Sequence, residues 1–99
     1  MKLVQFDFPF SGPFGPEMAQ AMDGLARSIN DEPGFLWKIW TENAETGEAG
    51  GIYAFADEAA ARAYIDKHSA RLAEFGIEGI RAKVFDVNEG LSEINRAPL

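Results

Sequence analysis

The side chains in this sequence that could do chemistry are one histidine and two tyrosines, set among many aromatic rings. His68 is the only histidine, and the chain carries eight Phe, two Trp and two Tyr. An imidazole titrates near neutral pH and can take a proton from a phenol or an enol. The phenols of Tyr53 and Tyr64 could hold a ligand hydroxyl or carbonyl. The set favours proton chemistry on an aromatic ligand, although each of these residues could equally belong to a packed core.

The spacing around His68 predicts the side that it faces. Tyr64, His68 and Leu72 follow one another at intervals of four, so they share one face of a helix. Arg71 lies next to His68 on that surface, where it could stabilise an anion or reach solvent. The catalytic candidates are His68, Tyr53 and Trp37, and the pocket candidates are Phe6, Phe8, Phe35, Tyr64 and Arg71.

Several other chemistries lack their residues. The chain has no cysteine, which excludes disulfides, thiolate zinc sites and thiol nucleophiles. A single histidine cannot provide paired histidine ligands, and neither a phosphate-binding glycine loop nor a Ser-His-Asp set is present. We therefore predict no metal ligands and no cofactor.

The net charge and the hydropathy of the sequence indicate which binding partners and which cellular compartment to expect. The chain has 9 Lys and Arg against 16 Asp and Glu, a net charge of −7, which repels nucleic acid and anionic membranes. It contains no run of about 18 apolar residues, and its start is charged and lacks a long apolar segment. We expect a cytoplasmic protein that binds neither nucleic acid nor membrane.

The elements that must position these residues follow from apolar periodicity. Alternation predicts strands, and apolar spacings of three and four predict helices. The 99 residues suit a single domain, 1–99, with the order βαββαβ. This is the ferredoxin-like α+β plan, a four-stranded antiparallel sheet with two helices on one face. The predicted strands span residues 3–10, 35–41, 50–55 and 80–87, the helices span 17–30 and 58–75, and a short helical turn falls within 88–99.

Alternation also divides the strand residues between the two faces of the sheet. The set assigned to the helix-covered face is Phe6, Phe8, Phe35, Trp37, Ile39, Tyr53, Phe55, Ile80 and Val84. The opposite face then keeps large apolar residues, and a monomer rarely exposes one continuous apolar patch of more than a few hundred Å². We expect that face to form a homodimer, with a partly polar solvent face as the alternative. The predicted dimer residues are Leu36, Trp40, Ile52, Phe85 and Val87.

Four segments of the chain resemble the YdhR-type putative monooxygenases. The resemblance covers nearly the whole chain, in matching order and without evident gaps. The segments are FSGPFG (residues 10–15), SINDEPGFLWKIWTE (residues 28–42), EAGGIY (residues 48–53) and AKVFDVNE (residues 82–89).

The resemblance implies a fold, an assembly and an activity. The fold is a dimeric α+β barrel of the antibiotic-biosynthesis-monooxygenase type, in which related enzymes oxidise phenolic or quinone-like substrates without metal or flavin. The resemblance transfers no catalytic residue. On this reading, an electron-rich aromatic substrate lies among Phe8, Trp37, Tyr53 and Tyr64, and His68 helps to deprotonate it. Its carbanion then reacts with dioxygen in a cavity that excludes water.

Three other functions are compatible with the same fold. A carrier or sensor could bind a small apolar or aromatic molecule in the pocket without chemistry. Haem-degrading relatives use a helix histidine, a role open to His68, but also an asparagine on the first strand, where this chain has Gln5 and Asp7. Lactone isomerisation has no distinguishing residue here.

Overall fold

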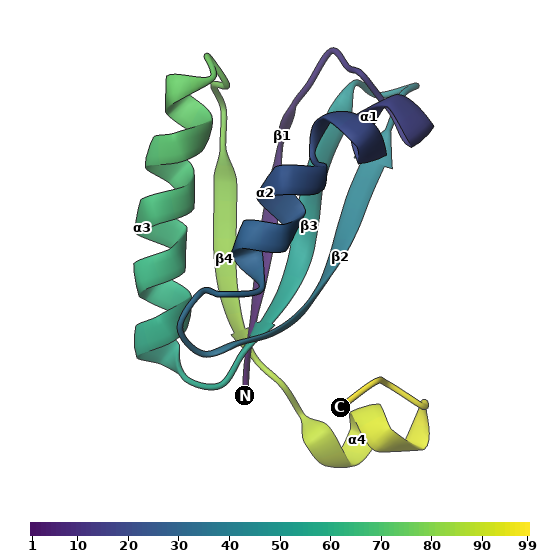
Figure 1. Ribbon diagram of the computed structural model, residues 1–99. Helices are drawn as coiled ribbons and strands as arrows, with labels where there is room; N and C mark the ends of the chain where they lie inside the picture. Colours follow the sequence, from purple (N-terminus) through teal and green to yellow (C-terminus); the bar gives the residue numbers. More distant parts are fainter.

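A single four-stranded antiparallel sheet forms the centre of the computed structural model, which describes all 99 residues. The strand order is β2-β3-β1-β4, so the first strand lies inside the sheet and pairs with both β3 and β4. This confirms the predicted ferredoxin-like α+β arrangement (Figure 1). The strands are β1 (Lys2–Pro9), β2 (Phe35–Asn43), β3 (Glu48–Phe55) and β4 (Arg81–Asp86).

The helices begin and end at residues suited to those positions. Pro16 opens the first helix, where its missing N–H has no intrahelical partner to lose. The Asp57 side chain caps the long third helix by accepting from the Ala60 N–H at 2.8 Å, and Gly76, at φ +81°, lies just beyond its end. The helices are α1 (Gly15–Ala21), α2 (Asp23–Ile29), α3 (Glu58–Glu74) and α4 (Glu89–Ile94).

The single helix predicted over residues 17–30 is in fact two short helices that meet at Met22. Met22 has φ −100° and ψ 6°, outside the helical region, but its N–H still donates to the Met18 carbonyl at 2.8 Å. Gly24, a poor helix former, follows the break closely. The apolar stripe therefore continues across the break while the chain changes direction.

A β-bulge in β2 reverses the predicted faces of that strand. Phe35 lies opposite Phe55, yet Trp37 lies opposite Ala54, so one extra residue is inserted between them. Because side chains alternate, the insertion sends every later residue of β2 to the other face. Trp37 and Ile39, assigned to the helix-covered face, lie on the opposite face. Lys38 and Trp40 lie under the helices, so the assignment of Trp40 to the dimer face was wrong.

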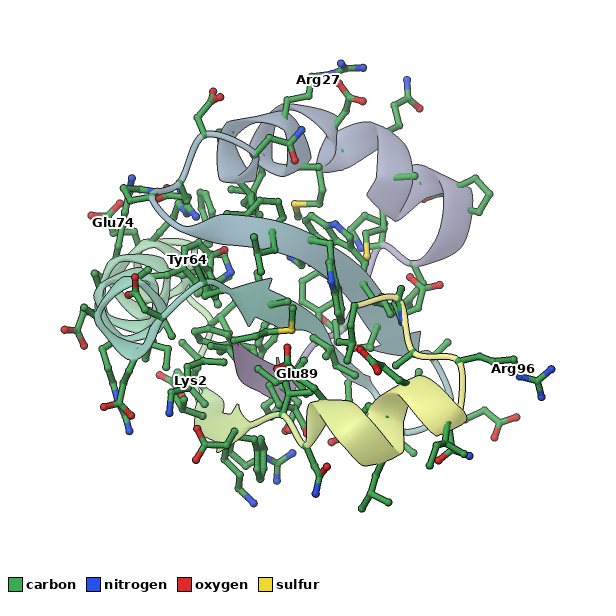
Figure 2. All side chains as sticks on the ribbon, turned by 90° about the horizontal axis from the view of Figure 1, so that it is seen from below. Lys2, Arg27, Tyr64, Glu74, Glu89 and Arg96 are labelled. Atoms are coloured by element: carbon green, nitrogen blue, oxygen red, sulfur yellow. The ribbon has the colours of Figure 1, made fainter.

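Two clusters of buried side chains lie between the sheet and the helices α1 to α3. We call the cluster that contains Phe6, Tyr53 and Tyr64 the solid end, and the cluster that contains Phe8 and Met18 the hollow end. Figure 2 shows Tyr64, a member of the first, on the side of α3 that faces the strands. The solid end consists of Val4, Phe6, Ile29, Tyr53, Phe55, Ala61 and Tyr64. The hollow end consists of Phe8, Met18, Ala49 and Leu72.

The fourth helix, α4, packs differently from the other three. Figure 2 shows it on the side of the strands away from α3. None of its residues is buried, and Leu91 and Ile94 are 62% and 76% exposed. None of the helices combines the length and the apolar character needed to cross a bilayer.

Candidate functional site

A cavity of about 350 Å³ opens at the hollow end, between the sheet and the helices. This volume lies within the range of small-molecule pockets. Eleven of its fourteen lining residues are hydrophobic, and Lys38 and His68 are the only ionisable ones. The lining residues are Phe8, Phe10, Met18, Ala21, Met22, Leu25, Lys38, Trp40, Ala49, Gly50, His68, Leu72, Phe75 and Ile77.

Three parts of the fold build the apolar walls. Phe8 projects from β1, and the rings of Phe10 and Phe14 pack edge to face at 5.7 Å just beyond that strand. Met18 and Met22, on and at the end of α1, line the cavity from the helix side. Methionine side chains are flexible and polarisable, so this wall can adapt to ligands of different shape.

The bulge in β2 and a glycine in β3 bring Lys38 into this apolar space. Trp40 lies opposite Gly51, and a Cβ added to Gly51 would meet the Lys38 Cε at 2.6 Å. The glycine therefore leaves the room through which the lysine side chain runs. The Lys38 Nζ lies 3.2 Å from the centre of the Trp40 ring and 4.5 Å from that of Tyr53. Both rings offer it cation–π contacts.

The Lys38 ammonium has no counter-ion within the chain. All five salt bridges involve other residues. Burial and the nearby positive charge of Arg71 lower the pKa of Lys38 from 10.5 to about 7. Both protonation states are therefore accessible near neutral pH, which suits a group that exchanges a proton with a ligand.

His68 is held in one orientation by Arg71. Its side chain is buried, and the Arg71 Nη2 and Nε lie 2.9 and 3.3 Å from its Nδ1. A guanidinium can only donate, so Nδ1 accepts, and the proton of the neutral ring is assigned to Nε2. Burial, Lys38 and Arg71 together lower the pKa of His68 to about 3. The imidazole therefore stays neutral at physiological pH and offers an N–H to its surroundings.

Aromatic rings fix His68 from the solid end. Its ring stacks on Tyr64 at 5.0 Å and meets Phe6 edge to face at 5.2 Å. Burial raises the pKa of both Tyr53 and Tyr64, so both phenols stay protonated. The Tyr64 hydroxyl is buried and has no hydrogen-bond partner. These tyrosines border the cavity residues without lining the cavity themselves.

The structure brings together only some of the residues predicted for the site. Phe8 and His68 line the cavity, and Arg71 holds His68. Phe6, Tyr53 and Tyr64 pack behind them in the solid end. Phe35 lies farther along, with its ring 6.0 Å from Phe55.

Trp37 lies apart from the cavity, on the sheet face opposite to the helices. Its indole Nε1 is buried and has no hydrogen-bond partner. The bulge that moved Trp37 away also brought in Lys38 and Trp40, which sequence reasoning missed. The available signal was the pair Gly50-Gly51 inside β3, because glycine in a strand interior often marks a close approach of other atoms.

The predicted dimer residues other than Trp40 occupy the outer side of the sheet or its margins. Ile52 and Phe85 project from the face away from the helices, and Phe85 is 44% exposed. Leu36 lies at the bulge and is 47% exposed, while Val87 follows β4. Ile39, at 51% exposed, joins them on that face. A patch of apolar side chains remains on the outer side.

Comparison with known proteins places the chain in a family. A family model described as "Putative mono-oxygenase ydhR" matches residues 3–98. The chain belongs to the YdhR family. No curated protein matches its sequence significantly. Carboxylates and the single histidine form no cluster of three or more that could hold a metal ion.

Several solved structures have a fold similar to that of this chain. A putative antibiotic biosynthesis monooxygenase from Deinococcus radiodurans is 12% identical, with a TM-score of 0.64 over 89% of this chain and 93% of that chain. A variant of SnoaB, a cofactor-independent oxygenase from Streptomyces nogalater, is 13% identical, with a TM-score of 0.59 over 88% and 93%. The monooxygenase ActVA-Orf6 of Streptomyces coelicolor, in complex with nanaomycin D, is 22% identical, with a TM-score of 0.61 over 88% and 87%. At these identities the likeness shows the fold alone.

Proposed function

We propose that this YdhR-family chain is a cofactor-independent monooxygenase that oxidises a small phenolic or quinone-like molecule in the cavity at the hollow end. The observation that carries the proposal is an apolar cavity of about 350 Å³ with two ionisable groups on its wall, in a member of a monooxygenase family. Such a space excludes water and strengthens the interaction of its few polar groups with a bound anion.

The proposed reaction draws its electrons from the substrate. A phenol loses its hydroxyl proton to the neutral amine of Lys38 or to the solvent, and a ring carbon of the anion forms a bond to dioxygen. The resulting peroxide takes up a proton and loses water, so that one oxygen atom becomes a quinone carbonyl and the other leaves as water. His68 does not take the hydroxyl proton in this scheme, as the sequence suggested, because burial lowers its pKa to about 3; it donates its Nε2 proton to the substrate oxygen, since Arg71 occupies Nδ1.

Oxygen uptake tests this function directly. The purified protein is incubated with a panel of phenols and hydroquinones in an oxygen electrode, and the product is analysed by mass spectrometry after reaction with isotopically labelled dioxygen. We expect stoichiometric oxygen uptake and one labelled atom in the product. Met22→Trp, which fills the cavity, should abolish uptake, whereas Arg62→Met at an exposed position of α3 should not change it. Uptake that is unchanged by Met22→Trp would place the reaction elsewhere.

A non-catalytic carrier of small aromatic molecules is the second candidate. Two observations favour a carrier. The cavity lining is mostly apolar, and His68, with a pKa of about 3, is a weak proton acceptor. Tight binding of a phenol without oxygen uptake would favour the carrier. Binding coupled to uptake would favour the oxygenase.

Dimerisation through the outer sheet face is part of the proposal. Ile39, Ile52 and Phe85 project from that face, Leu36 lies at its edge, and a patch of this kind usually meets a partner. A second copy of the chain is the expected partner. Light scattering should give a dimer mass for the wild type and a monomer mass for Phe85→Glu. A monomeric wild type would contradict this. A cytoplasmic setting, which the lack of cysteine permits, belongs to the same proposal.

A further inference from the structure

Lys38 is the one amine on the wall of the cavity, and no carboxylate lines that wall with it. Its side chain is partly buried, and a lysine drawn out of water into apolar surroundings usually has a partner within the protein. Here the salt bridges of the chain lie elsewhere, and the immediate neighbours of the Nζ are the rings of Trp40 and Tyr53.

The surroundings of Lys38 favour an anion at this point. Arg71 adds a second positive charge from α3, and its guanidinium is turned onto His68. His68 in turn is neutral, with its proton on the nitrogen that Arg71 does not occupy. This positive region stands out in a chain of net charge −7. Asp23 and Arg27 of α2, which border the groove outside β2, pair with each other.

The fold keeps this lysine in place at a cost. Gly51 has no side chain although it lies inside a strand, which leaves space for the Lys38 stem. The bulge in β2 directs that stem to the face under the helices. A lysine with no ligand to bind could reach solvent far more cheaply. We infer that Lys38 binds the ionised oxygen of the substrate, so that the cavity selects acidic phenols and hydroxyquinones as anions over neutral molecules of the same shape.

This inference rests on the proposed function only for the premise that the cavity binds the substrate. The proton of the pair has a defined source. A neutral Lys38 amine takes the hydroxyl proton of a phenol, and it takes a proton from the solvent when the ligand arrives already ionised, so that in both cases an ammonium lies beside an oxyanion. The low pKa of Lys38 supports that exchange, because a large share of the amine is neutral near pH 7 before the ligand arrives.

A matched pair of ligands tests the inference. Lawsone is a coloured hydroxynaphthoquinone whose anion absorbs at longer wavelength than its acid, and its methyl ether has the same rings without the acidic proton. We expect the wild type to bind lawsone as the anion at least about tenfold more tightly than the ether, the ratio typical of one charge-assisted hydrogen bond. Lys38→Met, which keeps the length of the stem, should lose this preference while its affinity for the ether changes by less than about twofold.

Two further variants control for charge and for folding. Lys38→Arg keeps the charge and should retain part of the preference for the anion, whereas Arg62→Met removes an exposed positive charge of α3 that makes no ion pair and should behave as the wild type. Equal preference for the anion in the wild type and in Lys38→Met would overturn the inference. Failure of the wild type to bind either ligand would overturn it too.

The outcome separates this inference from the proposed oxygenase. If lawsone binds as the anion through Lys38 but no phenol supports oxygen uptake, the inference stands and the oxygenase falls. If Lys38→Met turns over a phenol with unchanged kcat and KM, the oxygenase stands and the inference falls.

Discussion

The two ends of the space beneath the helices are built from the same strands but are filled differently. At the solid end, aromatic rings of β1, β3 and α3 pack edge to face, tilted or stacked, with centres 5.0 to 6.3 Å apart. At the hollow end, methionines and aliphatic residues share the wall with four aromatic rings and surround a cavity of about 350 Å³. A close-packed interior normally leaves few voids larger than a water molecule. The contrast indicates that one end provides stability and the other provides room for a ligand.

The two ionisable groups of the site lie where these ends meet. His68 touches Phe6 and Tyr64 of the solid end and also lines the cavity. Lys38 lies over the Tyr53 ring and reaches into the same space. Rigid rings on one side can hold the two groups in place while the methionine wall on the other side adjusts. Each prediction below tests this division of roles.

The largest expected effect is the loss of a ring from the solid end. Phe6 and Phe8 are neighbours on one face of β1, but Phe6 is 1% exposed within the ring cluster and Phe8 borders the cavity. Phe6→Ala should lower the free energy of unfolding by about 3–5 kcal/mol, because it opens a new void. Phe8→Ala should cost about 2 kcal/mol, since one side of its ring already faces open space. Urea unfolding at fixed protein concentration measures both.

Ligand affinity should show the opposite order. Phe8→Ala should weaken the binding of an aromatic ligand more than Phe6→Ala does, when the two are compared under conditions in which both variants are folded. Equal losses of stability would mean that the hollow end is packed as tightly as the solid end, and the comparison would fail.

The second prediction is that Lys38→Met stabilises the protein. The pKa of Lys38 is about 7 in the folded chain and near 10.5 in the unfolded chain, so between these values only the unfolded chain holds the proton. Stability of the wild type therefore rises with pH across that window and is lowest, for this group, at pH 7 and below. We expect the variant to exceed the wild type by about 1–3 kcal/mol at pH 7, after allowance for the lost cation–π contacts.

The pH dependence distinguishes this explanation from simple packing. The advantage of Lys38→Met should shrink steadily as the pH rises toward 10. A gain that is constant with pH would show that the methionine merely packs better. A lower stability of Lys38→Met would show that Lys38 stabilises the fold. Lys38 would then serve stability as well as ligand binding, contrary to the division between the two ends.

The third prediction concerns acid. Burial keeps His68 neutral in the folded chain with a pKa of about 3, whereas the unfolded chain takes up a proton below about 6.5. Stability is therefore lost as pH falls through this window, by about 1–2 kcal/mol between pH 6.5 and 5. His68→Gln, whose amide oxygen can still accept from Arg71, should lack this part of the slope. Parallel pH profiles for the two proteins would mean that His68 is already charged when folded.

Much of the fold could be read from the sequence because each signal was local. Alternation gave all four strands, and spacing gave α3. The break at Met22 was not predicted, because the apolar stripe runs through it unchanged. Apolar residues recur at the same spacing in a bent helix as in a straight one, so this spacing does not reveal the bend.

The site was predicted only in part because one inserted residue decides it. Period-two counting placed Trp37 toward the helices and Trp40 away from them, and the bulge in β2 exchanged the two. Nothing in the composition of β2 marks the bulge, since it depends on the pairing with β3. His68 was found because its helix has no such irregularity. Lys38 was missed because its position depends on the register between two strands.

The smallest expected effect is that of removing the Tyr64 hydroxyl. This change tests how far the closely packed solid end extends. No hydrogen bond of normal geometry reaches this buried hydroxyl, but the Tyr53 phenol and Arg71 lie near enough to affect the pKa of Tyr64, so its removal should change the free energy of unfolding by less than about 1 kcal/mol. Tyr64→Phe keeps the ring that stacks on His68, so ligand binding and oxygen uptake should match the wild type. Thermal unfolding and the lawsone titration measure the two effects on one sample. A marked loss of turnover in a stable Tyr64→Phe protein would mean that the phenol reaches the substrate, and the cavity would then extend into the end described here as solid.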